Sequence, residues 1–464
     1  MLDSRETAPA HASRDMYLDP ESRAASYSLK GANAAAIPGT PAALAWLAKN
    51  MGRLPLSDSL APAIRLAREG YAVDARYIGM AERHREVLEA NAEAAAVFLY
   101  RGQPPAPGFV LRQPDLAATL ERIAEQGEKG FYEGPVAAEM VRAVKAAGGI
   151  WQAADLAGYT VKVREPVVFT YRAAKIASSA LPSSGGLVLA IALGILEHLP
   201  YAESDAATRM HFVTEALRRA FHLRAQLMGD PDFVHVPVEQ LLSRETTAAL
   251  AADIRADRAI PSAEIESKGL PGQDGEHTTH LSIVDADGNR VAATLTINTF
   301  FGSGFVAGGT GVLLNNEMDD FAIGPGMPNI YGLTGGEANA IAPGKRPLSS
   351  MSPTFVEDGR GVLILGSPGG SRIISQVLLA TLEHVHGETP DAARLVSLPR
   401  YHAQYVPDRI EVEEDGFEPA VLESLRNKGH EVVELPRRWG NMQLVWVDRT
   451  TGLAVAVSDP RGNR

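Results

Sequence analysis

Thr278 is the residue whose position most suggests covalent chemistry. It follows residues 260–277, a stretch rich in proline, glycine and charge that is typical of an exposed linker, and it begins an alternating strand pattern at 278–285. A threonine hydroxyl is a weak nucleophile unless a base lies beside it. A terminal α-amine is such a base, because its pKa of about 7.7–8.0 leaves a neutral fraction near physiological pH. Thr278 gains that amine only if the chain is cut after His277.

Position alone does not establish this role for Thr278, since threonine pairs begin many strands through β propensity.

The sequence pattern along the chain mixes helices and strands without a regular βαβ rhythm. We expect an irregular start at 1–40, helices within 41–149, strands within 160–181, helices at 187–199 and 204–229, strands at 290–298 and 361–366, and a helix at 371–386. The pattern predicts an α+β or layered α/β fold rather than a doubly wound parallel sheet.

Composition excludes several classes of protein. The 464 residues carry a formal net charge of -12, which argues against nucleic acid and anionic membranes as partners. The absence of cysteine excludes disulfides, thiolate nucleophiles and cysteine-bound metals. No apolar run reaches about 18 residues, so we expect no membrane span, and the polar first residues have no apolar core of a signal peptide.

Several motifs occur in a fixed order along nearly the whole chain, and together they resemble the γ-glutamyltransferase family. They include SRETAPAHASRDMYLD (4–19), LPSSGG (181–186), GDPDFV (229–234), TTHLSIVDADGN (278–289), TLTINTFFGSG (294–304), LLNNEMDDF (313–321), PGKRPLSSMSPT (343–354), GSPGGSR (366–372) and SDPR (458–461). Four of them in this order (TTHLSIVD, NNEMDDF, PLSSMSPT and GSPGGSR) are too specific for a chance match.

The resemblance implies an αββα Ntn-hydrolase sandwich that is made as one precursor. A cut between His277 and Thr278 would give a large subunit, residues 1–277, and a small subunit, residues 278–464. Both subunits would contribute strands to one intertwined domain. The implied activity is γ-glutamyltransferase and glutathione hydrolase chemistry through an acyl-enzyme intermediate.

The family's catalytic roles fall on four residues of this chain. Thr278 would be the attacker in self-cleavage and later the nucleophile, and Thr296 would orient its hydroxyl. Gly369 and Gly370 match the oxyanion hole, and a glycine-rich turn that opens a helix does expose N–H groups where negative charge is favoured. The similar turn at residues 183–186 receives no catalytic role.

A γ-glutamyl donor carries an α-carboxylate and an α-ammonium, so its pocket needs both signs of charge. By resemblance, Arg5 would bind the carboxylate, with hydroxyls from residues 349–350 beside it, while an amide and two acids would hold the ammonium and a tyrosine in the loop at 322–336 would close the pocket. The residues in these roles are Arg5, Ser349, Ser350, Asn298, Glu317, Asp320 and Tyr331.

The expected partners are small molecules: glutathione and other γ-glutamyl compounds as donors, and water, amino acids or peptides as acceptors. We expect no cofactor and no metal, because His277 and His280 would point to opposite faces of a strand. Residues 302–304 do not complete a dinucleotide fingerprint. A periplasmic or secreted location follows from the resemblance alone.

Two alternatives stay open. One is a cephalosporin acylase of the same family, whose glutaryl donor lacks the ammonium that Asp320 would hold. The other is an inactive, shortened homologue, because family members carry a further N-terminal segment before the match to Arg5. We expect its absence to leave apolar surface exposed and to lower stability, which expression with and without an upstream extension would test.

Overall fold

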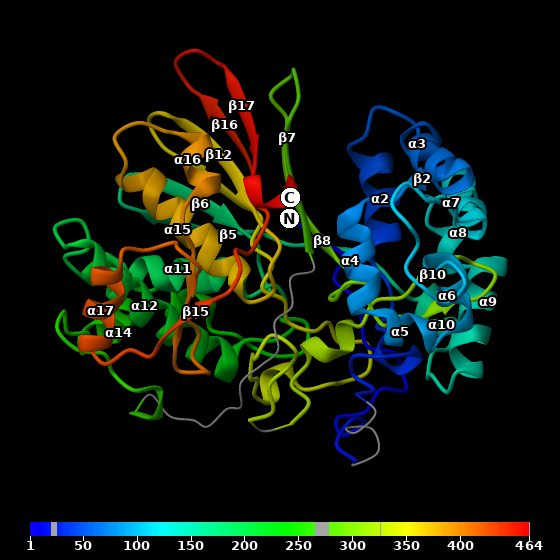
Figure 1. The fold of residues 1–464 in the computed structure, drawn as a ribbon, viewed down its shortest axis with the longest axis horizontal. Helices are drawn as coiled ribbons and strands as arrows, with labels where there is room; N and C mark the ends of the chain where they lie inside the picture. Colours follow the sequence, from blue (N-terminus) through cyan, green and yellow to red (C-terminus); the bar gives the residue numbers. More distant parts are fainter. Residues whose placement is uncertain (20–25, 265–277, 325, 464) are drawn as a thin grey trace.

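A six-stranded antiparallel sheet forms the centre of the protein, in a computed structural model that describes residues 1–19, 26–264, 278–324 and 326–463 (Figure 1). Its strand order is β17-β16-β12-β11-β6-β5. The strands are β5 (Val167–Tyr171), β6 (Ala174–Ser178), β11 (Thr354–Glu357), β12 (Gly361–Gly366), β16 (Gln443–Asp448) and β17 (Ala454–Ser458). Segments on both sides of residue 278 therefore build one sheet.

A second sheet lies against β12 and β16 and consists of β7 (Thr278–Val284) and β8 (Arg290–Thr296) (Figure 1). Because side chains alternate along a strand, one set of β7 residues faces the large sheet: His280 is buried, and the Ser282 hydroxyl donates to the Ile364 carbonyl at 3.2 Å. The other face is apolar and open, with Leu281, Ile283 and Val291 each 44–48% exposed.

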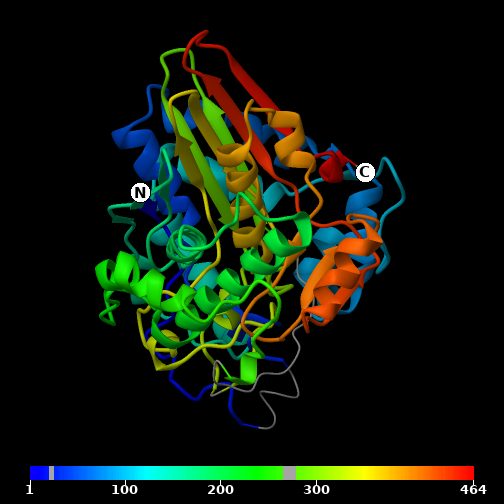
Figure 2. The same ribbon diagram turned by 90° about the vertical axis from the view of Figure 1, so that its left-hand side faces the viewer.

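Helices cover the outer face of the six-stranded sheet (Figure 2). The helix α11 (Gly185–Leu196) is buried almost throughout, because its sequence is apolar on all sides. It packs against α12 (Ala206–Leu227), α14 (Arg244–Ala251) and α15 (Arg372–His386). The helix α16 (Ala392–Ser397) packs against β16 and β17, α13 (Val238–Leu241) against α14, and α17 (Pro419–Asn427) against α12. The helix α17 packs beside a three-stranded sheet of β13 (Tyr401–His402), β14 (Ile410–Glu413) and β15 (Val432–Leu435).

Residues 40–157 form a helical region on the far side of β7 and β8 from the large sheet (Figure 1). It has its own apolar core around Trp151 and Met140. Its helices are α2 (Thr40–Asn50), α3 (Leu56–Glu69), α4 (Ala75–Arg83), α5 (Arg85–Glu89), α6 (Ala92–Phe98), α7 (Pro114–Gln126), α8 (Lys129–Tyr132), α9 (Gly134–Ala146) and α10 (Ala153–Ala157).

The first residues of the chain join these parts. The strand β1 (Leu2–Asp3) pairs with β4 (Lys162–Val163), and Thr7 pairs with Ile37, so Arg5 is held between the helical region and the large sheet. The architecture is α+β, as the sequence predicts. No helix within the described ranges is both long and apolar enough to cross a membrane.

Candidate active site

Thr278 begins β7 and lies directly opposite Thr296 on β8. Paired residues on one face of an antiparallel sheet have neighbouring side chains, and the Thr278 hydroxyl here donates to Thr296 Oγ1 at 3.4 Å. Thr296 Oγ1 also accepts the N–H of Asn298 at 2.8 Å, which fixes the hydroxyl toward Thr278. His277, the residue before the expected cut, lies outside the described residues.

His280, two residues after Thr278 on β7, helps to hold β7 and β8 together. Its Nδ1 lies 2.8 Å from Thr294 Oγ1 and its Nε2 lies 3.1 Å from Ser282 Oγ, so both ring nitrogens are engaged. Burial lowers the pKa of His280 to about 4, and the ring is therefore neutral near pH 7. A β-carbon on Gly366 would lie 2.3 Å from the imidazole, so this glycine lets β12 approach the histidine.

The turn between β12 and α15, residues 367–370, carries the two predicted oxyanion glycines. Gly369 has φ of 134° and Gly370 has φ of 55°, backbone angles that residues other than glycine rarely adopt. Neither of these amide N–H groups donates a hydrogen bond to any residue in the part of the chain that the structure describes. Side chains hold the turn from behind: Ser367 donates to Gln376 Oε1 at 2.7 Å, and Gln376 Nε2 donates to the Pro368 carbonyl at 2.9 Å.

One small pocket, of about 20 Å³, brings most of the predicted site together. Glu317 and Gly369 are both buried and do not line it; Glu317 contacts the pocket residue Arg5, and Gly369 precedes the pocket residue Gly370. The lining residues are Arg5, Arg224, Thr278, Thr296, Asn298, Asp320, Tyr331, Leu333, Ser349, Ser350, Met351, Gly370 and Ile373.

Arg5 is paired with both predicted ammonium-binding acids. Its Nη1 lies 2.6 Å from Glu317 Oε2 and its Nη2 lies 2.5 Å from Asp320 Oδ2. The remaining donors reach the carbonyls of Pro347 and Leu348, at 3.1 and 3.0 Å. Burial opposes the charge of Arg5, but the two carboxylates outweigh it and raise the pKa of Arg5. Burial raises the pKa of Glu317 well above its ordinary value.

Ser349 and Ser350 rest on the turn at residues 183–186. The Ser349 hydroxyl donates to Ser183 Oγ at 2.8 Å, and the Ser184 hydroxyl donates to the Ser349 carbonyl at 2.7 Å. The fit is close, because a β-carbon on Gly185 would lie 2.1 Å from Ser352 Oγ. The turn without an assigned role therefore supports the predicted carboxylate-binding hydroxyls.

Tyr331 closes one side of the pocket. Its hydroxyl donates to Asn298 Oδ1 at 2.6 Å, and a β-carbon on Gly370 would lie 2.3 Å from its ring. Asn298 itself has φ of 70°, a left-handed conformation that asparagine tolerates better than most residues. The loop is anchored where Asp319, whose pKa burial raises to about 7, accepts the N–H of Ile330 at 2.9 Å.

The sequence analysis missed four residues of this pocket, namely the apolar Leu333, Met351 and Ile373 and the charged Arg224. Arg224 lies in the last turn of α12 and is 4% exposed. The sequence analysis predicts a helix at 204–229 but not that its neighbours bury charged residues on it, as they do for Arg218, Arg219 and Arg224.

A second group of side chains has the residue types of a metal site, namely His211, Glu215 and His430. Their ligand atoms are already used within the protein. His211 Nδ1 lies 2.7 Å from His430 Nε2, and Glu215 pairs with Arg218 and Arg219 at 2.7 and 2.6 Å. These contacts join α12 to the end of α17.

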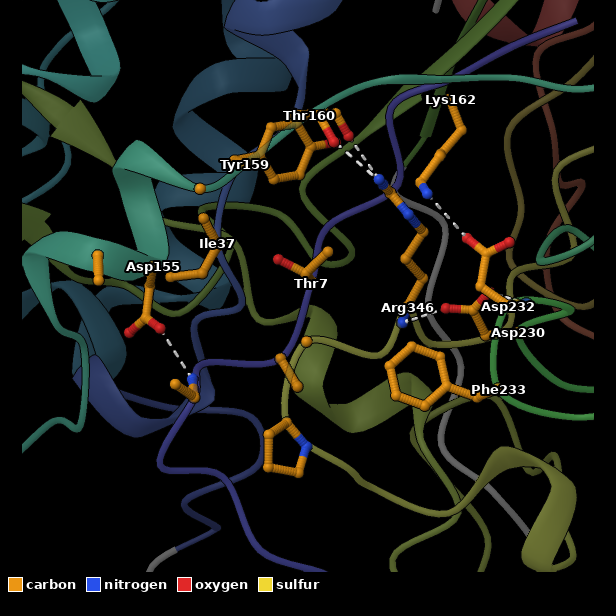
Figure 3. Close-up of a pocket in the computed structure, with 16 residues that line it drawn as sticks. Thr7, Ile37, Asp155, Tyr159, Thr160, Lys162, Asp230, Asp232, Phe233 and Arg346 are labelled. Atoms are coloured by element: carbon orange, nitrogen blue, oxygen red, sulfur yellow. Dashed lines mark hydrogen bonds and ion pairs between the residues drawn. The ribbon is translucent and has the colours of Figure 1, made fainter.

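A larger pocket of about 440 Å³ lies on the other side of the N-terminal segment (Figure 3). Its charged groups are paired: the Arg346 amide donates to Asp230 Oδ2 at 2.8 Å, its guanidinium donates to the carbonyls of Thr160 and Arg5, and Lys162 pairs with Asp232. Arg346, which lines this pocket, thus helps to hold the backbone of Arg5.

Comparison with known proteins agrees with the motifs and the fold. The family model described as Gamma-glutamyltranspeptidase matches residues 1–464. The glutathione hydrolase proenzyme of Escherichia coli (strain K12) is 41% identical over 99% of this chain and 80% of its own length, and that of Pseudomonas aeruginosa is 39% identical over 99% and 82%. A cephalosporin acylase from Bacillus halodurans superposes with a TM-score of 0.84 at 27% identity, covering 99% of this chain and 83% of that chain. The chain belongs to the gamma-glutamyltranspeptidase family.

Proposed function

We propose that this protein is an autoprocessing γ-glutamyltransferase and glutathione hydrolase. It cuts itself between His277 and Thr278 into fragments 1–277 and 278–464, and it then cleaves γ-glutamyl amides through an acyl ester on Thr278. The observation that carries the proposal is that Thr278, Gly370 and the pair of Arg5 and Asp320 line one pocket. The glutathione hydrolase proenzymes among its relatives support the same activity.

In maturation, Thr278 Oγ1 attacks the carbonyl carbon of His277. The bond from that carbon to the Thr278 nitrogen breaks as an ester to Oγ1 forms, and the nitrogen takes up the hydroxyl proton to become an α-amine. Water then hydrolyses the ester, which releases the His277 carboxylate and restores the hydroxyl. Thr296, at 3.4 Å from Thr278 Oγ1, holds that hydroxyl in place.

In turnover, the new α-amine accepts the Thr278 proton while Oγ1 attacks the γ-carbonyl of the donor. The amide N–H groups of Gly369 and Gly370 stabilise the oxyanion, and the leaving amine departs with the proton. Water or an acceptor amine then attacks the acyl ester and regenerates Thr278. Such preorganised donors act where water is excluded, which strengthens their effect.

The donor's γ-glutamyl end fits a pocket with both signs of charge. Its α-carboxylate would bind near Arg5 and the hydroxyls of Ser349 and Ser350. Its ammonium would bind near Asn298 and Asp320, with Glu317 joined to the same group through Arg5 but outside the pocket lining. A glutaryl group lacks the ammonium and leaves these acids without a ligand cation. The same chemistry therefore favours γ-glutamyl donors over the glutaryl donors of an acylase.

The first test is intact-mass analysis of the purified chain after incubation at neutral pH, beside Thr278→Ala. We expect two fragments that meet between residues 277 and 278, absent from the variant. The cleaved protein is then assayed with γ-glutamyl- and glutaryl-4-nitroanilide. Preferred release from the glutaryl compound would favour the acylase alternative, and an uncut, inactive chain would refute the proposal.

We also propose a periplasmic or secreted location, which rests on the family resemblance. Fractionation of the source cells, with antibody detection of either fragment, tests it. Recovery in the cytoplasmic fraction alone would overturn this assignment.

A further inference from the structure

Two buried arginines line the pocket, and their surroundings differ. Arg5 and Arg224 are 5% and 4% exposed. The guanidinium of Arg5 is already opposed by Glu317 and Asp320, with Glu6 at 3.4 Å as a third acid. Three acids therefore already occupy the terminal donors of this one guanidinium, and a substrate carboxylate at Arg5 alone would have to share those donors with them.

Among the residues that the structure describes, Arg224 forms no ion pair of this kind. Its Nε donates to Ser184 Oγ at 2.9 Å, and Asp320 is the acid that acts on its charge, from beyond ion-pair distance within the described ranges. Burial lowers the pKa of Arg224 to about 10, while attraction to Asp320 offsets part of this effect. The side chain therefore stays charged near pH 7, and a buried charge without a counter-ion is costly.

The Ser184 contact fixes where that charge points. Ser184 Oγ accepts from Arg224 and donates to the Ser349 carbonyl at 2.7 Å, so the turn at 183–186 joins Arg224 to the segment of Ser349 and Ser350. Using Nε for this contact leaves both terminal nitrogens of the guanidinium for a ligand, a geometry that suits a carboxylate.

We propose that Arg224 binds the α-carboxylate of the donor together with Arg5, and thereby sets the preference for donors that carry this group. This inference rests on the proposed γ-glutamyl chemistry. It gives the serine–glycine turn at 183–186 a role in substrate recognition, and it explains why an arginine is buried beside a second arginine.

The test uses the matured enzyme and two matched donors. γ-Glutamyl-4-nitroanilide carries both the ammonium and the α-carboxylate, whereas 4-aminobutyryl-4-nitroanilide has the same chain and ammonium without the carboxylate. For Arg224→Gln we expect KM for the first donor to rise about 10- to 100-fold, because a hydrogen-bonded charge pair is lost. KM for the second donor should change less than about twofold, and kcat should stay similar for both.

Arg209→Gln is the matched control, because Arg209 lies exposed near the other end of α12; both donors should behave as with the unchanged enzyme. If Arg224→Gln does not fold or mature, Arg224→Lys decides by the same comparison, since it keeps the charge but loses the two-pronged contact. Equal losses with both donors, no loss with either, or failure of both Arg224 variants to fold would overturn the inference. Absence of γ-glutamyl turnover in the unchanged enzyme would instead refute the proposed function.

Discussion

Two turns of nearly the same sequence, residues 183–186 and 367–370, each lead into a buried helix but serve different ends. In the first, the glycines make room for neighbours: added β-carbons on Gly185 and Gly186 would lie 2.1 Å from Ser352 Oγ and from the Ser179 carbonyl. In the second, Gly369 and Gly370 adopt positive φ and leave their N–H groups without acceptors among the described residues. The comparison shows that a glycine pair can provide close packing or free donors, and that the surroundings decide which.

The largest effect should come from placing a side chain in the second turn. Gly370→Ala would strain a residue at φ of 55° and drive a β-carbon into the Tyr331 ring, so the oxyanion donor moves. We expect kcat to fall by about 10²–10³ with little change in KM. Steady-state kinetics with γ-glutamyl-4-nitroanilide measures both.

Gly185→Ala is the counterpart in the first turn. Its β-carbon meets Ser352, so the expected result is a lower melting temperature, with kcat per folded molecule changed by less than about threefold. A normal kcat in Gly370→Ala, or a larger kcat loss in Gly185→Ala, would contradict the distinction between the two turns.

The next largest effect should come from Arg5, whose Nη2 donates to the Leu348 carbonyl beside Ser349. Arg5→Gln leaves the buried Glu317 and the partly buried Asp320 without their paired cation, so we expect the free energy of unfolding to fall by about 3–5 kcal/mol, together with a higher KM for γ-glutamyl donors. Urea unfolding and kinetics measure the two parts.

Arg14→Gln serves as the control, because the ion pair of Arg14 with Glu337 is largely exposed and should contribute no more than about 1 kcal/mol. Equal destabilisation by the two variants would show that burial of the Arg5 group does not matter.

Low pH should lower the stability of the folded protein through His280. This residue packs against Gly366, at the end of β12 and next to the second turn. Its folded pKa of about 4 lies below the ordinary value of about 6.5, so the unfolded chain binds more protons between these values. The resulting stability is fully present above pH 6.5 and is lost as the pH falls toward 4, by up to about 3 kcal/mol.

Urea unfolding at pH 7 and pH 4.5 measures this loss, and His280→Gln should show a smaller difference between the two pH values. An unchanged difference in the variant would assign the acid sensitivity to other groups.

The smallest effects should come from removing one hydroxyl in each turn, with KM changing for the first turn and kcat for the second. Ser184→Ala removes the hydrogen bond to Arg224, so we expect KM to rise about threefold while kcat is kept. Ser367→Ala loosens the second turn at Gln376 and should lower kcat by a similar factor while KM is kept. The same parameter changing in both variants would remove the functional distinction between the turns.

Much of the site could be predicted from the sequence, because its chemistry requires particular residue types in motifs that are local. Thr278 with its strand, the glycines at 369–370 and the hydroxyls at 349–350 each belong to a recognisable stretch. The helix ranges at 187–199 and 204–229 were close to α11 and α12, since apolar periodicity is set by local sequence. The burial of α12 on several sides was not predicted, because it depends on what packs around the helix.

The sequence by itself determined the family, the α+β class and the identity of the candidate nucleophile, since these follow from ordered motifs and local patterns. Only the tertiary structure decided that Arg5 is opposed by Glu317 and Asp320 while Arg224 faces the pocket without an acid partner among the described residues. The physical reason is that a charge acquires its role from partners brought close by folding, and residues 5, 224 and 317 are far apart along the chain.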